Sequence, residues 1–264
     1  MSKVLLFLVN FILFVGCIPS RPNAAVAPRQ QQNSSTAIQY ELPALKPGSE
    51  VVTHAGYTSS FNSNTLIPDW VAYELTVNET NGTVSRPSNS PFQPDPNLRG
   101  RQPDRSDYSR SGWDKGHLAP CADMKWSEQA MLESFYFSNV CPQNHDFNEK
   151  DWQKLENKAR NIARKKGSLY IICGPVITTN EYGKIGQKGV VIPDYFFKAF
   201  LYKDNNGFHS IAYLMPNKYT GKPVNEFAMS VNDLEQIINI DLFVHLDDKI
   251  EEVVENQFEL ADWL

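Results

Sequence analysis

Segments with strand character and segments with helical character occur in blocks along this sequence, without regular alternation. Five segments are rich in β-branched and aromatic residues and are predicted to contain strands: residues 50–62, 70–77, 168–177, 190–202 and 208–216. Two helical patterns, 126–137 and 149–166, separate the first two of these segments from the last three. Such blocks are typical of α+β folds, whereas a parallel sheet needs a crossover between consecutive strands. We therefore predict an α+β fold with a mainly antiparallel central sheet flanked by helices.

The second of these helical patterns is the clearer one. Its apolar residues recur at the spacing of one helix face: Trp152, Leu155, Ala159, Ile162 and Ala163. Gly167 follows three basic residues and is expected to end this helix. Ser127 is expected to cap the first helix, and two further helices are predicted near 231–240 and 249–256.

The first residues of the chain have the composition of an export signal. One lysine precedes an apolar run from Val4 to Val15, which is too short to span a bilayer as a helix but suits a secretory signal. The run ends in Gly16-Cys17, a pattern that resembles the lipobox of bacterial lipoproteins, in which the cysteine is lipidated. We therefore expect 1–16 to be a lipoprotein-type signal peptide and Cys17 to carry lipid. An ordinary signal peptide with a coincidental cysteine is the alternative.

This signal predicts an exported, lipid-anchored bacterial protein in the periplasm, or at the outer membrane or cell surface. Residues 18–39 are rich in Pro, Gln, Asn, Ser and Ala and have no apolar period. Residues 17–44 are therefore expected to carry the lipid and form a flexible tether. Residues 45–264 remain for one domain, which is long enough to bury a sizeable core.

Three cysteines lie in this domain, namely Cys121, Cys141 and Cys173. None has CxxC spacing, which disfavours a zinc site, and an odd number cannot all pair. Cys173 lies in an apolar run and is predicted to be a buried thiol. Cys121 and Cys141 could form a disulfide in an oxidising compartment, and the sequence leaves this open.

Charge is distributed unevenly along the chain, whose net charge is −5 at pH 7. Eleven acids and one base lie between Val224 and Leu264, so this tail carries −10 and the remainder carries +5. Seven bases and two acids lie between Lys150 and Lys166, and four arginines occupy the second half of a long loop predicted at 84–112. A basic face separated from an acidic end can bind a polyanion despite the overall charge. A solvated helix face is the alternative for the basic helix.

Asp114-Lys115-Gly116-His117 form a compact polar group between apolar stretches. Histidine has an ordinary pKa of about 6.5, so it is mostly neutral at pH 7 and suited to act as a general base. Hydrolysis of a phosphodiester needs such a base to deprotonate water, and a cation that neutralises the phosphoryl oxygens. Mg²⁺ prefers oxygen ligands and keeps several waters, so one or two protein oxygens suffice to hold it. His117 is therefore a candidate base, and a structural histidine is the alternative when this motif is taken alone.

Two further motifs follow in order: Ser138-Asn139-Val140-Cys141-Pro142-Gln143, and then Asn148 with Trp152, Leu155 and Glu156. Together with the histidine motif they closely resemble the DNA/RNA non-specific endonucleases, the endonuclease G-like ββα-metal nucleases. The family signature is Asp-Arg-Gly-His, then Ser-Asn-x-x-Pro-Gln, then Asn-x-x-x-Trp-x-x-Leu-Glu. The resemblance covers roughly 45–264 and implies a ββα-metal motif in the active site.

The resemblance implies a Mg²⁺-dependent hydrolase that cleaves the backbones of DNA and RNA without base specificity and leaves 5′-phosphate ends. Mg²⁺ is the expected cofactor, and Mn²⁺ or another divalent cation could replace it. Members of the family often form dimers, so a homodimer is also expected. A nucleic-acid-binding surface lipoprotein that keeps the fold without turnover is the main alternative, because Lys115 stands where the family has arginine.

Four site residues follow from their positions in the three motifs. The resemblance makes His117 the general base that activates water and Asn148 the single direct protein ligand of Mg²⁺. It makes Glu156 the residue that holds a water on the ion. Asn139 corresponds to a residue that supports the site by hydrogen bonding.

Arg86 and Lys115 are the candidates for contact with the phosphate. Lysine is a compact point charge, whereas the family's arginine offers a planar fork, so the geometry of this contact is expected to differ. Several of these residues also have structural alternatives. Asn148, followed by acidic residues, is a good helix N-cap, and Glu156 could pair with Arg160 at i,i+4. Arg86 could be a solvated loop residue.

Overall fold

The computed structural model describes residues 38–46, 48–89 and 91–263. The expected signal peptide, the lipidated Cys17 and the tether up to residue 37 lie outside these residues. None of the helices in the described part of the chain is long and apolar enough to cross a membrane.

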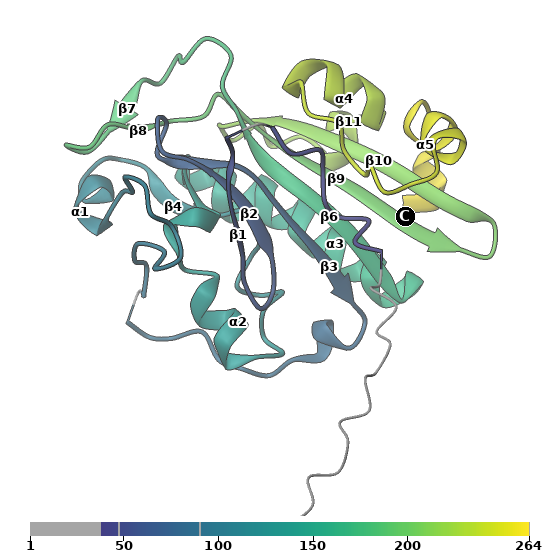
Figure 1. The fold of residues 1–264 in the computed structure, drawn as a ribbon, viewed down its shortest axis with the longest axis horizontal. Coiled ribbons are helices and arrows are strands. Elements are labelled where there is room, and N and C mark those ends of the chain that lie inside the picture. The colour runs from purple at the N-terminus through teal and green to yellow at the C-terminus, as the bar shows by residue number, and fades with distance from the viewer. Residues whose placement is uncertain (1–37, 47, 90, 264) are drawn as a thin grey trace, which may run out of the picture. The chain divides into compact units, whose positions relative to one another are not determined.

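A seven-stranded antiparallel sheet forms the centre of the domain (Figure 1). Its strands lie in the order β1-β2-β3-β6-β9-β10-β11. Their bounds are Glu50–Thr53 (β1), Thr58–Asn62 (β2), Ile67–Thr76 (β3), Ser168–Val176 (β6), Tyr195–Asp204 (β9), Gly207–Pro216 (β10) and Ala228–Met229 (β11). β6 lies between β3 and β9, with Ile172 paired to Ala72 on one side and to Ala199 on the other. The predicted α+β fold with a mainly antiparallel sheet is confirmed.

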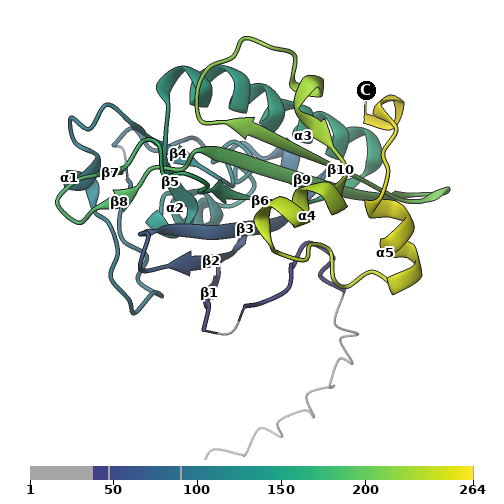
Figure 2. The ribbon, with the colours of Figure 1, turned by 90° about the horizontal axis from the view of Figure 1, so that it is seen from above.

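Helices cover both faces of this sheet (Figure 2). Their bounds are Arg105–Tyr108 (α1), Glu128–Glu133 (α2), Gln153–Lys166 (α3), Val231–Ile238 (α4) and Asp248–Glu255 (α5). Successive side chains of a strand point to opposite faces. β3 therefore supplies Val71 and Tyr73 to the core beneath α3, and Trp70 and Ala72 to the core beneath α4.

A separate two-stranded ribbon carries the histidine motif. β4 (Asp114–His117) pairs antiparallel with β5 (Val140–Gln143), and His117 lies opposite Val140. After β5 the chain passes through a π-helical turn, Phe147–Trp152, directly into α3. Two antiparallel strands followed by a helix are the ββα arrangement that the resemblance implies.

Two strand segments differ from the sequence-based expectation. Residues 50–62 hold two strands, β1 and β2, rather than one. The run 190–202 is divided, because Val190–Val191 (β8) pairs with Lys184–Ile185 (β7) in a small ribbon of its own. Pro193 lies between β8 and β9, and because proline has no N–H it cannot extend the ladder of the main sheet.

Both predicted helix caps are confirmed. The side chain of Ser127 accepts a hydrogen bond of 3.3 Å from Ala130 N at the start of α2. Gly167 ends α3 with φ of +95°, a conformation that costs glycine little. α2 is shorter than expected and ends at Glu133.

Residues 40–44, which the sequence assigns to the tether, pack against the sheet. The ring of Tyr40 lies edge-on to Tyr170 and Phe208, at centroid distances of 5.3 and 5.1 Å. Ala44 N donates to Asp241 O at 2.8 Å. These contacts attach this segment to the folded domain.

Candidate active site

A cavity of about 480 Å³ lies where β4, the turn after it and the start of α3 meet. We call it the His117 pocket. Its lining residues are Arg86, Lys115, His117, Pro120, Cys121, Ala122, Asn148, Glu149, Gln153, Glu156, Asn157 and Arg160. The fold therefore brings together the predicted base, the predicted metal residues and both predicted phosphate contacts, from three separate parts of the chain.

His117 ends β4 with its imidazole against the rings of Phe92 and Phe135, at centroid distances of 5.1 and 4.9 Å. Its carbonyl accepts a hydrogen bond of 3.2 Å from Trp152 Nε1. Nε2 is buried without a hydrogen-bond partner among the described residues, so Nδ1 is the nitrogen at the pocket. Burial, and secondly the charge of Arg86, lower the pKa of His117 from 6.5 to about 3. The side chain is therefore a neutral imidazole at pH 7.

Gly116 allows β4 and β5 to lie close together beside the base. A Cβ on this residue would overlap the buried side chain of Gln143. The glycine of the motif is therefore required by the close approach of the partner strand.

Asn148 lies in the π-helical turn and lines the His117 pocket. Its Nδ2 donates to Asp114 Oδ2 at 3.0 Å, which orients the amide and turns Oδ1 the other way. His145 Nδ1 lies 3.0 Å from the same oxygen. The capping alternative for Asn148 is wrong, because Asn144 Oδ1 accepts the hydrogen bond of Phe147 N at the start of the turn, at 3.1 Å.

Glu156 lies on the first turn of α3 and lines the pocket. Burial raises the pKa of its carboxyl from 4.5 to about 7, although the charges of Lys198 and Arg160 oppose the rise. The ion pair of Arg160 is made with Asp123, at 2.5 Å between Nη1 and Oδ1, rather than with Glu156. The Glu156 carboxyl therefore lies near the midpoint of its titration at neutral pH.

Asn139 lies behind the pocket rather than in its lining. Its Oδ1 accepts from Ala119 N and its Nδ2 donates to Ala119 O, both at 2.8 Å. Leu118 N donates to the carbonyl of Asn139 at 3.0 Å. These bonds hold the backbone directly after His117, which agrees with the supporting role expected for Asn139.

Two cations border the pocket on aromatic surfaces. Arg86 is exposed, and its Cζ lies 5.4 Å from the ring centroid of Phe135. Lys115 Nζ lies 5.6 Å from the ring centroid of Phe92. Burial lowers the pKa of Lys115, and the charge of Arg105 adds to the effect.

Lys198 is a buried cation that the sequence analysis missed. It is 0% exposed, its Nζ donates to Leu118 O at 3.0 Å, and Nζ lies 4.7 Å from the ring centroid of Trp152. Trp152 also binds the carbonyl of His117, so the two side chains hold two consecutive carbonyls. Lysine is almost never fully buried without a partner. The sequence signal is a lysine within the run of apolar and aromatic residues 195–202 of β9.

All three cysteines of the domain are free thiols. Cys121 lines the His117 pocket, and Cys141 is buried in β5. The disulfide that the sequence left open is therefore not formed. Cys173 is fully buried, as predicted.

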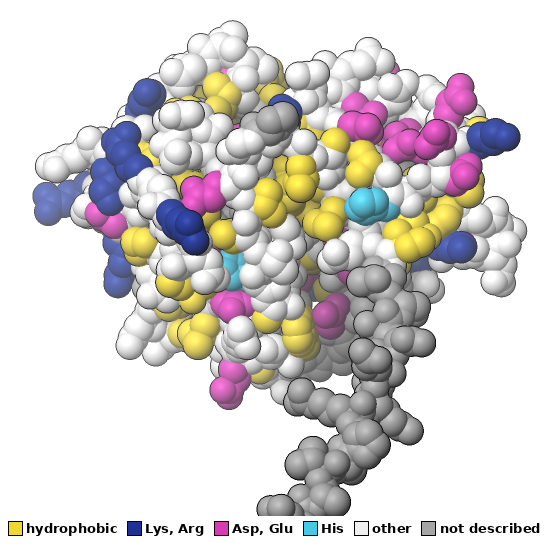
Figure 3. Space-filling view, viewed as in Figure 1, with side chains coloured by type: hydrophobic (Ala, Val, Ile, Leu, Met, Phe, Trp, Pro, Cys, Tyr) yellow, Lys and Arg dark blue, Asp and Glu magenta, His cyan; other side chains and the backbone are white. Residues whose placement is uncertain are grey.

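The bases of α3 and the turn before it are largely engaged. Four of them form ion pairs: Lys150–Asp146 at 2.6 Å, Lys154–Asp151 at 3.4 Å, Arg160–Asp123 at 2.5 Å and Lys166–Asp204 at 3.3 Å. Lys158 Nζ donates to Trp263 O at 2.7 Å. This segment therefore does not present a continuous basic face. In Figure 3, acidic side chains gather over α4 and α5, and lysine and arginine side chains gather around α1 and β7.

The donors of the pocket suit a hard cation. In the described part of the chain, no group of three or more His, Cys, Asp and Glu side chains is arranged to hold a metal ion. The pocket offers oxygen instead, from the amide of Asn148 and the carboxyl of Glu156. This set fits an ion such as Mg²⁺ that keeps several waters, and it does not fit a zinc site built from nitrogen and sulfur.

Known proteins resemble this chain in sequence and in fold. The nuclease EXOG, mitochondrial, of Mus musculus is 28% identical over 245 residues, which are 87% of this chain and 66% of the relative. Nuclease 1, mitochondrial, of Schizosaccharomyces pombe is 32% identical over 228 residues, which are 80% of this chain and 70% of the relative. The crystal structure of an EndoG/EndoGI complex superposes with a TM-score of 0.72 at 26% identity, over 80% of this chain and 91% of that chain.

The match extends over most of the domain. The chain spans 58–66% of the length of the four EXOG relatives from mouse, frog, zebrafish and human. The profile of the DNA/RNA non-specific endonucleases matches residues 33–249, which include every element from β1 to α4. With the ββα geometry and the motifs in place, this match shows that the chain belongs to the DNA/RNA non-specific endonuclease family.

Proposed function

We propose that the protein is a divalent-metal-dependent endonuclease that hydrolyses phosphodiester bonds of DNA and RNA without base specificity. The observation that carries the proposal is the His117 pocket, where a neutral imidazole, two oxygen donors and two cations converge. Membership of the family and the names of the relatives, which are nucleases, support it.

His117 is the general base in this proposal. With its proton on the buried Nε2, the lone pair of Nδ1 faces the pocket and can accept a proton from water. Phe92 and Phe135 hold the ring, and Trp152 holds the carbonyl of the same residue. Because burial keeps the imidazole neutral, no proton has to leave it before it can act.

Asn148 and Glu156 would hold Mg²⁺, or Mn²⁺ or another divalent cation in its place. Asp114 accepts a hydrogen bond from Nδ2 of Asn148, so Oδ1 of Asn148 would be the direct ligand, and the carboxylate of Glu156 would hold a water of the ion. The bound ion supplies positive charge to the phosphoryl and leaving oxygens. A neutral amide ligand leaves the charge of that ion undiminished.

Arg86 and Lys115 would bind the phosphates of the substrate. Both side chains line the His117 pocket and are positively charged. Contacts to phosphate carry no sequence information, which fits an enzyme without base specificity. The resemblance adds that the products carry 5′-phosphate ends.

The test uses protein comprising residues 38–264, incubated with supercoiled plasmid and with RNA, in Mg²⁺ and in EDTA. His117→Ala is compared with His245→Ala, because His245 is exposed and lies outside the pocket lining. Degradation of both substrates that needs Mg²⁺, survives in H245A and is lost in H117A supports the proposal. Binding without cleavage by the unmutated protein would contradict the enzyme, and cleavage by H117A would contradict the base.

We also propose that the protein is exported and anchored by lipid on Cys17. The apolar run from Val4 to Val15 and the Gly16-Cys17 pattern support this, and these residues lie outside the described part of the chain. Labelling with palmitate that is abolished by Cys17→Ser, and recovery of the protein in the membrane fraction, are the expected results. A mature N-terminus without lipid would contradict the anchor.

The homodimer implied by the resemblance stays a prediction. The molar mass of residues 38–264 in solution tests it. A mass twice that of one chain is expected, and a monomer over the accessible range of concentration would contradict it.

A further inference from the structure

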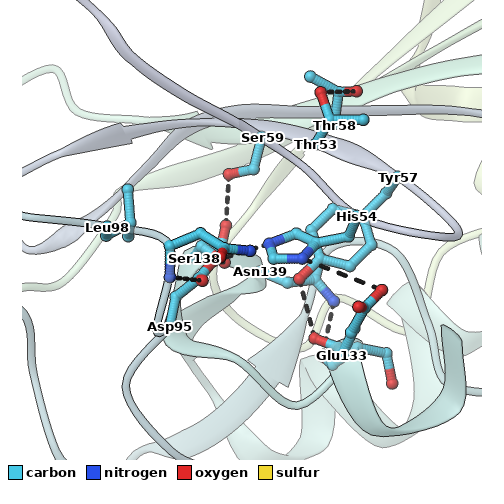
Figure 4. Close-up of polar contacts among 12 residues, drawn as sticks. Thr53, His54, Tyr57, Thr58, Ser59, Asp95, Leu98, Glu133, Ser138 and Asn139 are labelled. Atoms are coloured by element: carbon cyan, nitrogen blue, oxygen red, sulfur yellow. Dashed lines mark hydrogen bonds and ion pairs between the residues drawn. The ribbon is translucent and has the colours of Figure 1, made fainter. Parts of the chain in front are cut away.

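A buried polar cluster outside the His117 pocket joins three segments that are far apart in the sequence (Figure 4). Asp95, in the long loop after β3, lies at its centre. Its Oδ2 is 2.7 Å from His54 Nε2, in the turn between β1 and β2, and accepts from Ser138 Oγ at 2.5 Å, just before β5. Its Oδ1 accepts from Asn97 N at 2.9 Å. We call His54, Asp95 and Ser138 the Asp95 network.

The Asp95 network holds a carboxylate inside the protein. Asp95 is 1% exposed, and the side chains of His54 and Ser138 are also buried. Although burial opposes it, the hydrogen bonds from His54 and Ser138 lower the pKa of Asp95 below its usual 3.8. Because both residues donate to the same carboxylate oxygen, neither acts as a base for the other, and the cluster is not a nucleophilic triad.

One route from Asp95 to the base runs through the aromatic wall of the pocket. Three residues before Asp95, the ring of Phe92 lies against His117 with a centroid distance of 5.1 Å. Between them, Gln93 N donates to Phe135 O at 3.3 Å, and the ring of Phe135 is the other aromatic neighbour of His117. The anchored carboxylate therefore holds the loop that supplies this wall.

A second route runs through the backbone behind the base. Ser138 is held on both sides, because its carbonyl accepts from Ser59 Oγ at 2.5 Å while its hydroxyl donates to Asp95. The next residue, Asn139, makes two hydrogen bonds of 2.8 Å with Ala119, two positions after His117. A displacement of Ser138 would therefore also move Asn139 and the backbone next to His117.

We propose that Asp95 is a positioning residue for His117, acting through the aromatic wall and through Ser138-Asn139. This inference rests on the proposed function, in which His117 is the base. A base displaced by a fraction of an ångström loses catalytic efficiency while substrate binding at Arg86 and Lys115 is retained. The Asp95 network therefore contributes to turnover rather than to affinity.

The test compares variants that remove one donor to Asp95 with a matched control. Ser138→Ala removes the hydroxyl, and His54→Leu removes the imidazole, whereas His54→Gln keeps an N–H donor. Ser210→Ala is the control, because Ser210 is also buried and donates to Val254 O at 2.8 Å, away from the pocket. The measured quantities are kcat and KM on an oligonucleotide in Mg²⁺. The rate at which diethyl pyrocarbonate modifies His117, followed by peptide mass spectrometry without metal, is measured in parallel.

In S138A and H54L we expect kcat to fall about 10- to 100-fold with KM within about twofold. H54Q should recover most of the loss, and S210A should keep the unmutated kcat. Modification of His117 should become several-fold faster in S138A than in S210A, because its wall is loosened. Thermal destabilisation of S138A and H54L with unchanged kcat and unchanged reactivity of His117 would overturn the proposal. If the unmutated protein cleaves nothing, the proposed function fails, and the reactivity of His117 still decides the positioning role.

Discussion

Burial shifts the pKa values of His117 and Glu156 in opposite directions, because the imidazole is charged when protonated and the carboxyl when deprotonated. It lowers the pKa of His117 and raises that of Glu156, so it favours the uncharged form of both. The charge of Arg86 adds to the first effect, and the charge of Lys198 opposes the second. The pocket is therefore suited to receive positive charge on the side of Glu156 and to keep His117 unprotonated.

The pH dependence of activity should follow Glu156 rather than His117. His117 stays neutral above a pH of about 3, whereas the Glu156 carboxyl gains its proton as the pH falls through about 7. We expect kcat/KM to fall on the acid side with a break no higher than about 7, and to be low but flat between pH 5 and 8 in Glu156→Gln. A break near 6.5 that persists in E156Q would show that the base is a histidine of ordinary pKa.

The elements that place these residues are the β4–β5 ribbon and the helix that follows it. Close contact within the ribbon depends on Gly116, since any side chain there overlaps Gln143. His117 comes next along β4, so a shift of the ribbon at Gly116 would also move the base.

Gly116→Ala tests this contact. We expect a loss of about 1–3 kcal/mol in the free energy of unfolding, measured with urea, because the added methyl group overpacks the ribbon. Gly100→Ala is the control, since a Cβ there meets the end of the Glu50 side chain at 3.0 Å and Ser63 Cβ at 3.2 Å, which are much milder contacts than the overlap at Gly116. Equal stability of G116A and the unmutated protein would contradict the overpacking argument.

α4 and α5 contain a second set of acids with altered pKa. Glu255 is 5% exposed, and burial, followed by the charge of Glu235, raises its pKa from 4.5 to about 9. The folded state therefore holds a proton that the unfolded state releases above pH 4.5, and stability falls as the pH rises from there towards 9.

Glu255→Gln should remove this fall in stability with rising pH. The stability of E255Q relative to the unmutated protein is expected to increase between pH 5 and pH 8, by at least about 1 kcal/mol. Glu259 is exposed and lies on the same tail, so Glu259→Gln should show no such trend. Urea denaturation at several pH values measures both, and parallel curves for E255Q and the unmutated protein would contradict the prediction.

Patterns within a few residues of sequence predicted the main helices and strands. The features that they missed depend on contacts between residues far apart in the sequence. The apolar face of α3 and the caps at Ser127 and Gly167 were readable because each depends on neighbours within a turn or two. Of the residues that the motifs assigned to the site, His117, Asn148 and Glu156 line the pocket, and their roles stay predictions. The burial of Lys198 and the anchoring of Asp95 were not readable, because each depends on partners 41 to 80 positions away.

At the scale of the whole domain, the charges of the described residues are arranged so that α3 offers little unpaired positive charge to a polyanion. Most bases of α3 are paired with acids or carbonyls, and the acidic tail lies over α4 and α5. The basic helix that the sequence suggested as a binding face is therefore mainly a source of internal contacts.

Binding of DNA should accordingly show a modest dependence on salt. If Arg86 and Lys115 make the main phosphate contacts, the logarithm of the affinity should fall against the logarithm of salt concentration with a slope of about −2. Titrations of a short duplex in EDTA between 50 and 200 mM NaCl are the measurement. A slope steeper than about −5 would show that further bases, on α3 or around α1 and β7, also bind the backbone.

The π-helical turn at Phe147–Trp152 sets the angle around the helix axis between Asn148 and Glu156, the two residues proposed to hold the metal ion. A regular α-helix rotates about 100° per residue, so eight residues would leave Glu156 about 80° away from Asn148 around the axis. A π-helical turn spreads one revolution over more residues and reduces that angle, which lets both side chains line one pocket. A chain that kept these eight residues but wound them as a regular α-helix would form a complete helix and still point its two oxygen donors in different directions.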